Sequence, residues 1–202
     1  AYERFDDMLK REAPDLVDVC TPPDVHAPLL KQALNMGYPC MVEKPITTSV
    51  KDADEVIKLS KERGVGLYVL HDYSYVPSMR EARRIVASGK IGDIIVVETR
   101  YFTSLRKERY YEKDHWAHRL PCGILNSELA PHLLMLLLEF LHEIQNVNVF
   151  ATKMSTLPYI IADELRVVLK SSDNMIGYVG LSYNSPILYH TLDLIGSKGC
   201  IL

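Results

Sequence analysis

The sequence has few cysteines, and they lie far apart. Its four cysteines are Cys20, Cys40, Cys122 and Cys200, and no two of them form a Cys-x-x-Cys pair. Such pairs are typical of zinc knuckles and dithiol redox sites, so we expect neither of these and predict no metal. Cys20 and Cys40 fall within apolar runs, where a thiol usually packs as a small core side chain. Few and widely spaced cysteines favour a reducing, cytoplasmic location.

The sequence also lacks an excess of basic residues and any long apolar run. Lys and Arg number 23 against 26 Asp and Glu, a formal net charge of -3, so no basic field indicates a nucleic-acid partner. The most apolar run, Leu133 to Leu138, is too short to span a bilayer, and no charged-then-apolar leader opens the chain. We therefore expect a soluble globular protein that binds neither nucleic acid nor a membrane.

A glycine-rich phosphate loop is missing as well. The nearest match, Gly64-Val-Gly66, precedes an apolar run instead of following one, so its glycines are interpreted as a helix stop and a strand start. The first residues resemble the middle of a helix, and Leu202 comes just after a turn, so we interpret the chain as a piece of a longer protein. If a dinucleotide binds, we expect residues outside these 202 to hold its pyrophosphate.

The first ninety residues alternate between apolar runs and amphipathic helical segments. Asp24 and Ser49 are candidate N-caps, and Gly64 and Gly89 follow predicted helix ends. A strand, a helix and a strand in that order form a crossover unit, so the strands should be parallel. We predict strands at 16–20, within 38–43 and at 65–70, and helices at 25–36, 50–63 and 78–88.

The pattern changes near Gly92, where longer strand-like segments replace this alternation. One helix is predicted among them, at about 125–141. Short polar connections join the later segments, which favours antiparallel pairing. The predicted strands are 94–102, 147–153, 163–170, 175–182 and 189–195.

The sequence therefore predicts an α/β chain of two domains. Residues 1–90 would form the later half of a Rossmann-like, doubly wound parallel sheet, which binds dinucleotides in its complete form. Residues 91–202 would form an α+β domain with a large, mostly antiparallel sheet and a helix against it.

A lysine stands where one of the predicted parallel strands ends. The run from Tyr38 leads into Glu43-Lys44-Pro45, and ligands of open α/β sheets bind at the carboxyl ends of the strands. Pro45 restricts Lys44 to extended backbone, so the amine is presented from a stiff segment. Lys44 is therefore a candidate proton donor and acceptor. The alternative is a surface turn closed by a Glu–Lys pair.

A neighbouring strand end carries Thr21, Pro22 and Pro23, and His26 follows shortly afterwards. In a parallel sheet this end should lie at the same edge as Lys44. A tight turn there would let the backbone approach a flat ligand. The alternative is a capped turn with no ligand.

The second candidate for chemistry is Glu128-Leu-Ala-Pro-His132. On a helix this spacing places the carboxylate and the imidazole on one face, so that Glu128 can orient or charge His132. Pro131 would bend such a helix. Two alternatives remain open: Glu128 may precede the helix, and His132 may be a structural histidine at a helix start.

Taken in order, these segments resemble the Gfo/Idh/MocA family of NAD(P)-dependent oxidoreductases. The resemblance runs across nearly the whole chain and depends on the order and spacing of short motifs. The family begins with a strand, a glycine-rich loop and a helix, which would lie before Ala1, and it usually ends beyond Leu202. The motifs are Val19-Cys20-Thr21-Pro22 with His26, Glu43-Lys44-Pro45, His71 with Pro77, Gly89-Lys90-Ile91-Gly92, Glu128-x-Ala-x-His132 and Gly196-Ser-Lys-Gly199.

The resemblance implies hydride transfer between a nicotinamide ring and a hydroxyl-bearing carbon, typically of a sugar, an inositol or a related polyol. The cofactor would be NAD or NADP. Lys44 matches the motif lysine that helps bind substrate and relays a proton, and His132 matches the acid/base histidine. Glu128, the third catalytic candidate, stands where the family usually has aspartate. The residues that match cofactor-lining positions are Thr21, Pro22, His26, Glu43 and Lys44.

Two departures from the family pattern bear on activity. The Gly-Gly-Gly entry to the histidine helix reads Pro121-Cys122-Gly123 here, and a later aspartate is replaced by Met135. Because Lys44 and His132 are kept, we favour an active dehydrogenase or reductase, although residues 1–202 alone would be inactive.

Two other functions remain possible on the sequence. One is a non-catalytic binding or assembly protein that keeps the fold. The other is a dehydratase, isomerase or glycosidase that recycles bound NAD. For the enzyme, the resemblance implies a small-molecule substrate and a homo-oligomer formed through the sheet domain.

Overall fold

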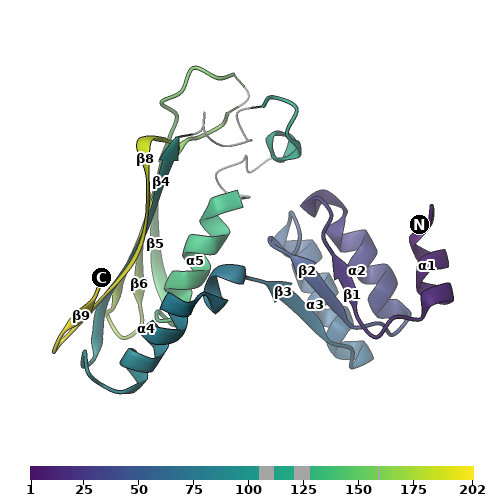
Figure 1. The fold of residues 1–202 in the computed structure, drawn as a ribbon, viewed down its shortest axis with the longest axis horizontal. Coiled ribbons are helices and arrows are strands. Elements are labelled where there is room, and N and C mark those ends of the chain that lie inside the picture. Colours follow the sequence, from purple (N-terminus) through teal and green to yellow (C-terminus); the bar gives the residue numbers. More distant parts are fainter. Residues whose placement is uncertain (105–111, 121–127, 159) are drawn as a thin grey trace. The chain divides into compact units, whose positions relative to one another are not determined.

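The computed structural model describes residues 1–104, 112–120, 128–158 and 160–202. The chain divides into two compact units, Ala1–His71 and Asp72–Leu202. Each unit has its own hydrophobic core, and Figure 1 labels the elements of both.

The first unit is built on a parallel sheet in the order β1-β2-β3. Helix α2 packs beside α3 and against β1 and β2, so the alternation of strands and helices follows the predicted crossover pattern. The elements are α1 (Phe5–Glu12), β1 (Val17–Val19), the 3-10 helix η1 (Pro23–Val25), α2 (His26–Asn35), β2 (Cys40–Glu43), α3 (Val50–Arg63) and β3 (Leu67–Leu70).

The end signals of α3 act as the sequence predicted. The Ser49 hydroxyl accepts the backbone N–H of Asp52 at 3.1 Å, which satisfies one of the free donors of the first turn. At the other end, Gly64 takes a left-handed conformation with φ 65°, which costs glycine little because it has no Cβ.

Two expectations for the first unit are wrong. Asp24 does not cap α2: it lies inside η1, and Val25 stands at the N-cap position without a side-chain bond. Pro22 and Pro23 fix the backbone into this tighter turn before the α-helix starts. Cys40 is buried as expected, but Cys20 is exposed, because β1 already ends at Val19.

The second unit contains a six-stranded sheet in the order β5-β6-β7-β4-β8-β9. All its pairs are antiparallel except β4 with β7, which confirms the predicted large, mostly antiparallel sheet. The elements are the 3-10 helix η2 (Asp72–Tyr75), α4 (Pro77–Ala87), β4 (Ile94–Ser104), the 3-10 helix η5 (Trp116–Arg119), α5 (Ala130–Leu138), β5 (Ile144–Thr152), β6 (Glu164–Ser171), β7 (Ile176–Ser182), β8 (Asn184–Gly196) and β9 (Cys200–Ile201).

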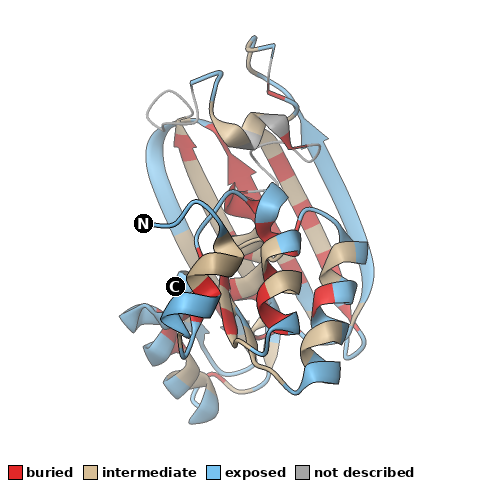
Figure 2. Cartoon of the chain, turned by 90° about the vertical axis from the view of Figure 1, so that its right-hand side faces the viewer, coloured by how far each residue is buried: buried red, intermediate tan, exposed pale blue. Residues whose placement is uncertain are grey.

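Helix α5 packs on one face of this sheet, where alternate strand residues are buried. Leu165, Val167 and Leu169 of β6 point into the core with Leu133 and Leu137 of α5. The approach is close: a Cβ on Gly177 would lie 2.6 Å from a methyl group of Leu141. Figure 2 shows the same alternation as buried and partly exposed residues along the central strands, whereas the edge strand β5 and much of β8 are exposed.

The regular α-helix α5 runs from Ala130, with Pro131 in its first turn, where proline fits. Glu128 and Leu129 form a π-helical turn that leads directly into it. The expected start near 125 and the Pro121-Cys122-Gly123 motif lie outside the described residues.

The compact units divide earlier than the predicted boundary between residues 90 and 91. Met79 and Ala82 of α4 belong to the core of the second unit. The apolar face of this helix thus packs in the core of the second unit, although the sequence pattern of α4 continues the earlier alternation.

Within the described ranges, every helix is too short or too polar to cross a membrane. Nor does any group of three His, Cys, Asp or Glu side chains in that part of the chain have the arrangement of a metal site.

Candidate functional site

The carboxyl ends of the three parallel strands lie at one edge of the first unit. Val19 pairs with Val42, and Glu43 pairs with Leu70. The residues that follow these strands, including Thr21 and Lys44, therefore leave the sheet at the same edge. Ligands of open α/β sheets bind at this position.

His26 joins two of these strand ends. It starts α2 and is fully buried, at 0% exposure. One ring nitrogen, Nε2, lies 2.8 Å from the carbonyl oxygen of Thr21, and the other, Nδ1, lies 3.0 Å from the carbonyl oxygen of Pro45. Both ring nitrogens of this predicted cofactor contact are thus occupied by backbone carbonyls.

Lys44 follows the central strand of the sheet and is partly buried. Its backbone N–H donates to the Glu43 carboxylate at 3.3 Å, and the peptide bond between Lys44 and Pro45 is cis. Since His26 holds the Pro45 carbonyl, the backbone around Lys44 is fixed on its C-terminal side. The predicted residues Thr21, Pro22, His26, Glu43 and Lys44 are consequently neighbours in one unit.

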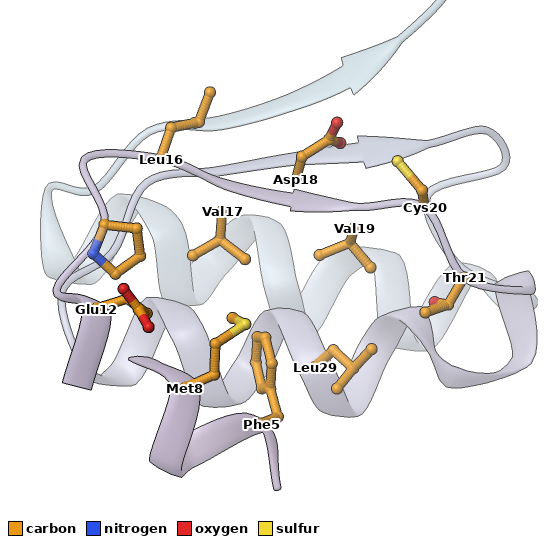
Figure 3. Close-up of a pocket in the computed structure, with 11 residues that line it drawn as sticks. Phe5, Met8, Glu12, Leu16, Val17, Asp18, Val19, Cys20, Thr21 and Leu29 are labelled. Atoms are coloured by element: carbon orange, nitrogen blue, oxygen red, sulfur yellow. The ribbon is translucent and has the colours of Figure 1, made fainter. Parts of the chain in front are cut away.

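An apolar groove runs beside β1 at the edge of this sheet. Its volume is about 460 Å³. Figure 3 shows Val17 and Val19 pointing toward Met8, Phe5 and Leu29, while Asp18 and Cys20 lie on the other side of the strand. The hydrogen bond with the Asp18 carboxylate raises the pKa of the Cys20 thiol, so this cysteine is a weak nucleophile at neutral pH.

In the second unit, His132 lies in the first turn of α5 against the η2 turn. Its side chain is 11% exposed, and Nδ1 lies 3.5 Å from a carboxylate oxygen of Asp72. The ring of Tyr73 stacks on the imidazole with 4.4 Å between ring centroids and 22° between planes. His132 is therefore held from two sides by consecutive residues.

Glu128 is the remaining predicted catalytic residue. It is buried, at 6% exposure, and stands just before α5. Glu128 lies in a π-helical turn that leads directly into α5. It therefore precedes only the regular α-helix, and its shared face with His132 stays a prediction.

A second histidine extends the ring cluster around His132. His190 of β8 lies 5.2 Å from the ring of Tyr73 and 5.1 Å from that of Tyr101. Burial lowers the pKa of His190, so this imidazole is neutral at physiological pH. Tyr73 and His190 also line a cavity of about 390 Å³ between the start of α4 and strand β8.

Sequence reasoning missed the contacts of Asp72 and Tyr73 with His132, and the contact of His190 with Tyr73. Asp72 carried a weak signal, since it follows a predicted strand end. Tyr73 and His190 carried none, because their contacts join residues more than fifty positions apart.

Two family models match this chain in succession. The model described as "Oxidoreductase family, NAD-binding Rossmann fold" matches residues 1–71. The model described as "GFO/IDH/MocA C-terminal domain" matches residues 79–202. Together they cover both compact units in order.

Individual proteins resemble the chain over part of their length. The uncharacterized oxidoreductase YdgJ of Escherichia coli is 32% identical over 121 residues, which cover 59% of this chain and 34% of that protein. The chain thus aligns with about a third of this curated relative.

Two solved structures share the fold with a TM-score of 0.87 each. The myo-inositol 2-dehydrogenase of Lactobacillus plantarum is 21% identical, covering 99% of this chain and 60% of that one. The WlbA dehydrogenase of Bordetella pertussis, in complex with NADH and UDP-GlcNAcA, is 20% identical, covering 98% of this chain and 61% of that one.

Proposed function

Because this chain belongs to the GFO/IDH/MocA family of oxidoreductases, we propose that the protein containing it transfers a hydride between NAD and a hydroxyl-bearing carbon of a sugar, an inositol or a related polyol. Membership confirms the resemblance drawn from the motifs. NAD is the cofactor that the description of the matched N-terminal model names. The substrate class is supported by what the similar structures are named for, a myo-inositol dehydrogenase and a complex with a nucleotide sugar.

The observation that carries the proposal is the position of Lys44. It follows the central strand of a sheet whose family model is NAD-binding, at the edge where ligands of such sheets bind. Its backbone is held by the His26 contact with the next carbonyl. A lysine fixed in this way can bind a substrate hydroxyl and exchange a proton with it.

We assign the other candidate residues in the same scheme. The bound NAD would supply the hydride acceptor or donor, which is chemistry that no side chain provides. Thr21, Pro22 and Glu43 would line the cofactor. His132 would act as the acid/base at the reacting oxygen, with Glu128 as a supporting carboxylate.

The experiment is turnover by the full-length protein with NAD(H) on a panel of polyols and keto-sugars. Lys44→Met and His132→Ala should each lower kcat by about 100-fold or more, because each removes a proton-transfer group. Lys51→Met and His142→Ala are matched controls at exposed positions and should leave kcat unchanged.

Unchanged turnover in both Lys44→Met and His132→Ala would reject the assignment of these residues. Product formation without net reduction or oxidation of NAD would instead favour a dehydratase, isomerase or glycosidase that recycles the cofactor.

A further inference from the structure

We propose that Asp72 and Tyr73 position His132, so that Nε2 is the nitrogen that exchanges a proton with the substrate. This inference rests on the proposed function of His132 and adds two residues to it. Both belong to the η2 turn, in the same compact unit as His132. Neither lies in a motif that pointed to catalysis in the sequence.

The Asp72 carboxylate is fixed by its own backbone. Its Oδ1 atom accepts the N–H of Tyr73 at 2.9 Å, a local bond that limits rotation of the side chain. The same oxygen lies 3.5 Å from Nδ1 of His132. Contacts between catalytic groups are often this long without ligand and shorten in the reacting complex.

Tyr73 fixes the plane of the His132 ring. The two rings stack at 4.4 Å, and the Tyr73 ring has His190 as a second neighbour at 5.2 Å. Because burial keeps His190 neutral, this side of Tyr73 adds no charge to the cluster. The stacked ring therefore restricts the imidazole plane by packing alone.

Arg83 connects the η2 turn to the helices α4 and α5. Arg83 of α4 donates to the carbonyl of Ser74 and also pairs with Glu139, at the end of α5. Ser74 is 5% exposed. Since α5 carries His132 in its first turn, Arg83 connects the turn that presents Asp72 to the helix that presents the imidazole.

This arrangement selects one tautomer of His132. A neutral imidazole has one N–H, and a carboxylate can only accept. With the proton on Nδ1 directed at Asp72, Nε2 carries the lone pair. On oxidation of the alcohol, the substrate would lose a hydride from carbon to NAD and a proton from its hydroxyl to Nε2. The imidazolium formed would be stabilised by Asp72.

The first test reads the tautomer directly by nitrogen NMR of the full-length protein labelled with ¹⁵N-histidine. We expect His132 to be protonated on Nδ1 in the wild type. In Asp72→Ala no carboxylate faces Nδ1, so the proton should shift toward Nε2. Asp72→Glu should restore the wild-type tautomer, and Asp93→Asn, at an exposed position, should not disturb it.

The second test compares kcat with KM. Asp72→Asn should lower kcat by about tenfold with little change in KM, and Asp72→Glu should recover most of the loss. Tyr73→Phe, which keeps the ring, should retain activity, whereas Tyr73→Leu should lose it.

The two tests separate this inference from the proposed function. A wild-type tautomer with Nε2 protonated, or one that Asp72→Ala leaves unchanged, would overturn the role of Asp72. If instead the tautomer depends on Asp72 but no substrate is turned over, the positioning role stands and the oxidoreductase proposal fails.

Discussion

At the scale of single residues, His26 connects two backbone segments of the first unit. Its two ring nitrogens lie within 3.0 Å of two carbonyl oxygens, one from each strand-end segment. A carbonyl can only accept, so each contact needs an N–H on the ring nitrogen that faces it. We therefore interpret His26 as a link between the Thr21 and Pro45 segments, which line the predicted cofactor side of the sheet.

Replacing His26 should destabilise the protein. The loss should be larger when the new side chain has no hydrogen-bond donor. In His26→Phe both carbonyls lose their partner, which should cost about 3 kcal/mol of unfolding free energy. His26→Gln keeps an amide donor and should cost less. Urea unfolding measures both variants, with the exposed His142→Phe as control. Equal stability of His26→Phe and the wild type would contradict the link.

The candidate residues that sequence reasoning found are those that a local rule can locate. Thr21 and Lys44 follow apolar runs, and the rule that parallel strands end at one edge brings them together before any coordinates are known. The neighbours of His132 could not be found in this way, because stacking of Tyr73 on His132 depends on how α5 packs against a distant turn.

At the scale of elements, Asp163 organises the segment that leads into β6. It is fully buried and accepts the backbone N–H groups of Met154 and Ser155 at 2.7 Å each, and the Asn184 amide at 3.1 Å. Burial alone would raise the pKa of this carboxyl, but these hydrogen bonds to the charged form outweigh it and lower the pKa.

This lowered pKa predicts how stability depends on pH. Because Asp163 binds protons less readily when folded, its contribution is complete above the unfolded pKa of about 3.9 and is lost as the pH falls through the lower folded value. Asp163→Asn should therefore cost about 2 to 3 kcal/mol at pH 7, with the difference from wild type shrinking toward pH 3.

Urea unfolding at pH 7, 5 and 3 measures this difference. Asp54→Asn, at an exposed position of α3, serves as the control and should follow the wild type at every pH. A deficit of Asp163→Asn that stays constant down to pH 3 would show that the carboxylate charge is not what holds the segment.

Elements with strong end signals were predictable, and those shaped by tertiary packing were not. Ser49 and Gly64 gave α3 both of its ends. The place of α4 in the second core depends on which side chains pack together, and helical periodicity carries no such information.

At the scale of the whole molecule, the face of the large sheet opposite α5, here called the outer face, has the composition of an interface. It carries two arginines stacked on aromatic rings: Arg100 lies 5.7 Å from the ring of Tyr178, and Arg166 lies 5.4 Å from that of Phe102. Tyr189 stacks on Phe102. Aromatic residues and arginine are enriched at protein interfaces, and no described helix of the second unit packs on this face (Figure 1).

We propose that this face forms a homo-oligomer, and Phe150 offers a direct test. Its side chain is 70% exposed and it pairs across the strands with Arg166, so a glutamate there should leave folding intact. Phe150→Glu should lower the mass measured by light scattering after gel filtration. Val50→Glu, equally exposed on α3, should not. An unchanged mass in Phe150→Glu would exclude this face.

The order of the strands in this sheet also shows where sequence reasoning ends. The short connections predicted the antiparallel neighbours β6 and β7. The parallel pairing of β4 with β7 joins strands about eighty residues apart, and alternation along a strand does not identify its partner.

The measurement that tests the central claim most directly is transfer of deuterium from NADH labelled at C4 of the nicotinamide to a keto-sugar or keto-inositol in the full-length protein. We predict that deuterium appears on the carbon that becomes the alcohol, and that Lys44→Met reduces this transfer by about 100-fold. Absence of deuterium in every product, or equal transfer by Lys44→Met, would contradict the account.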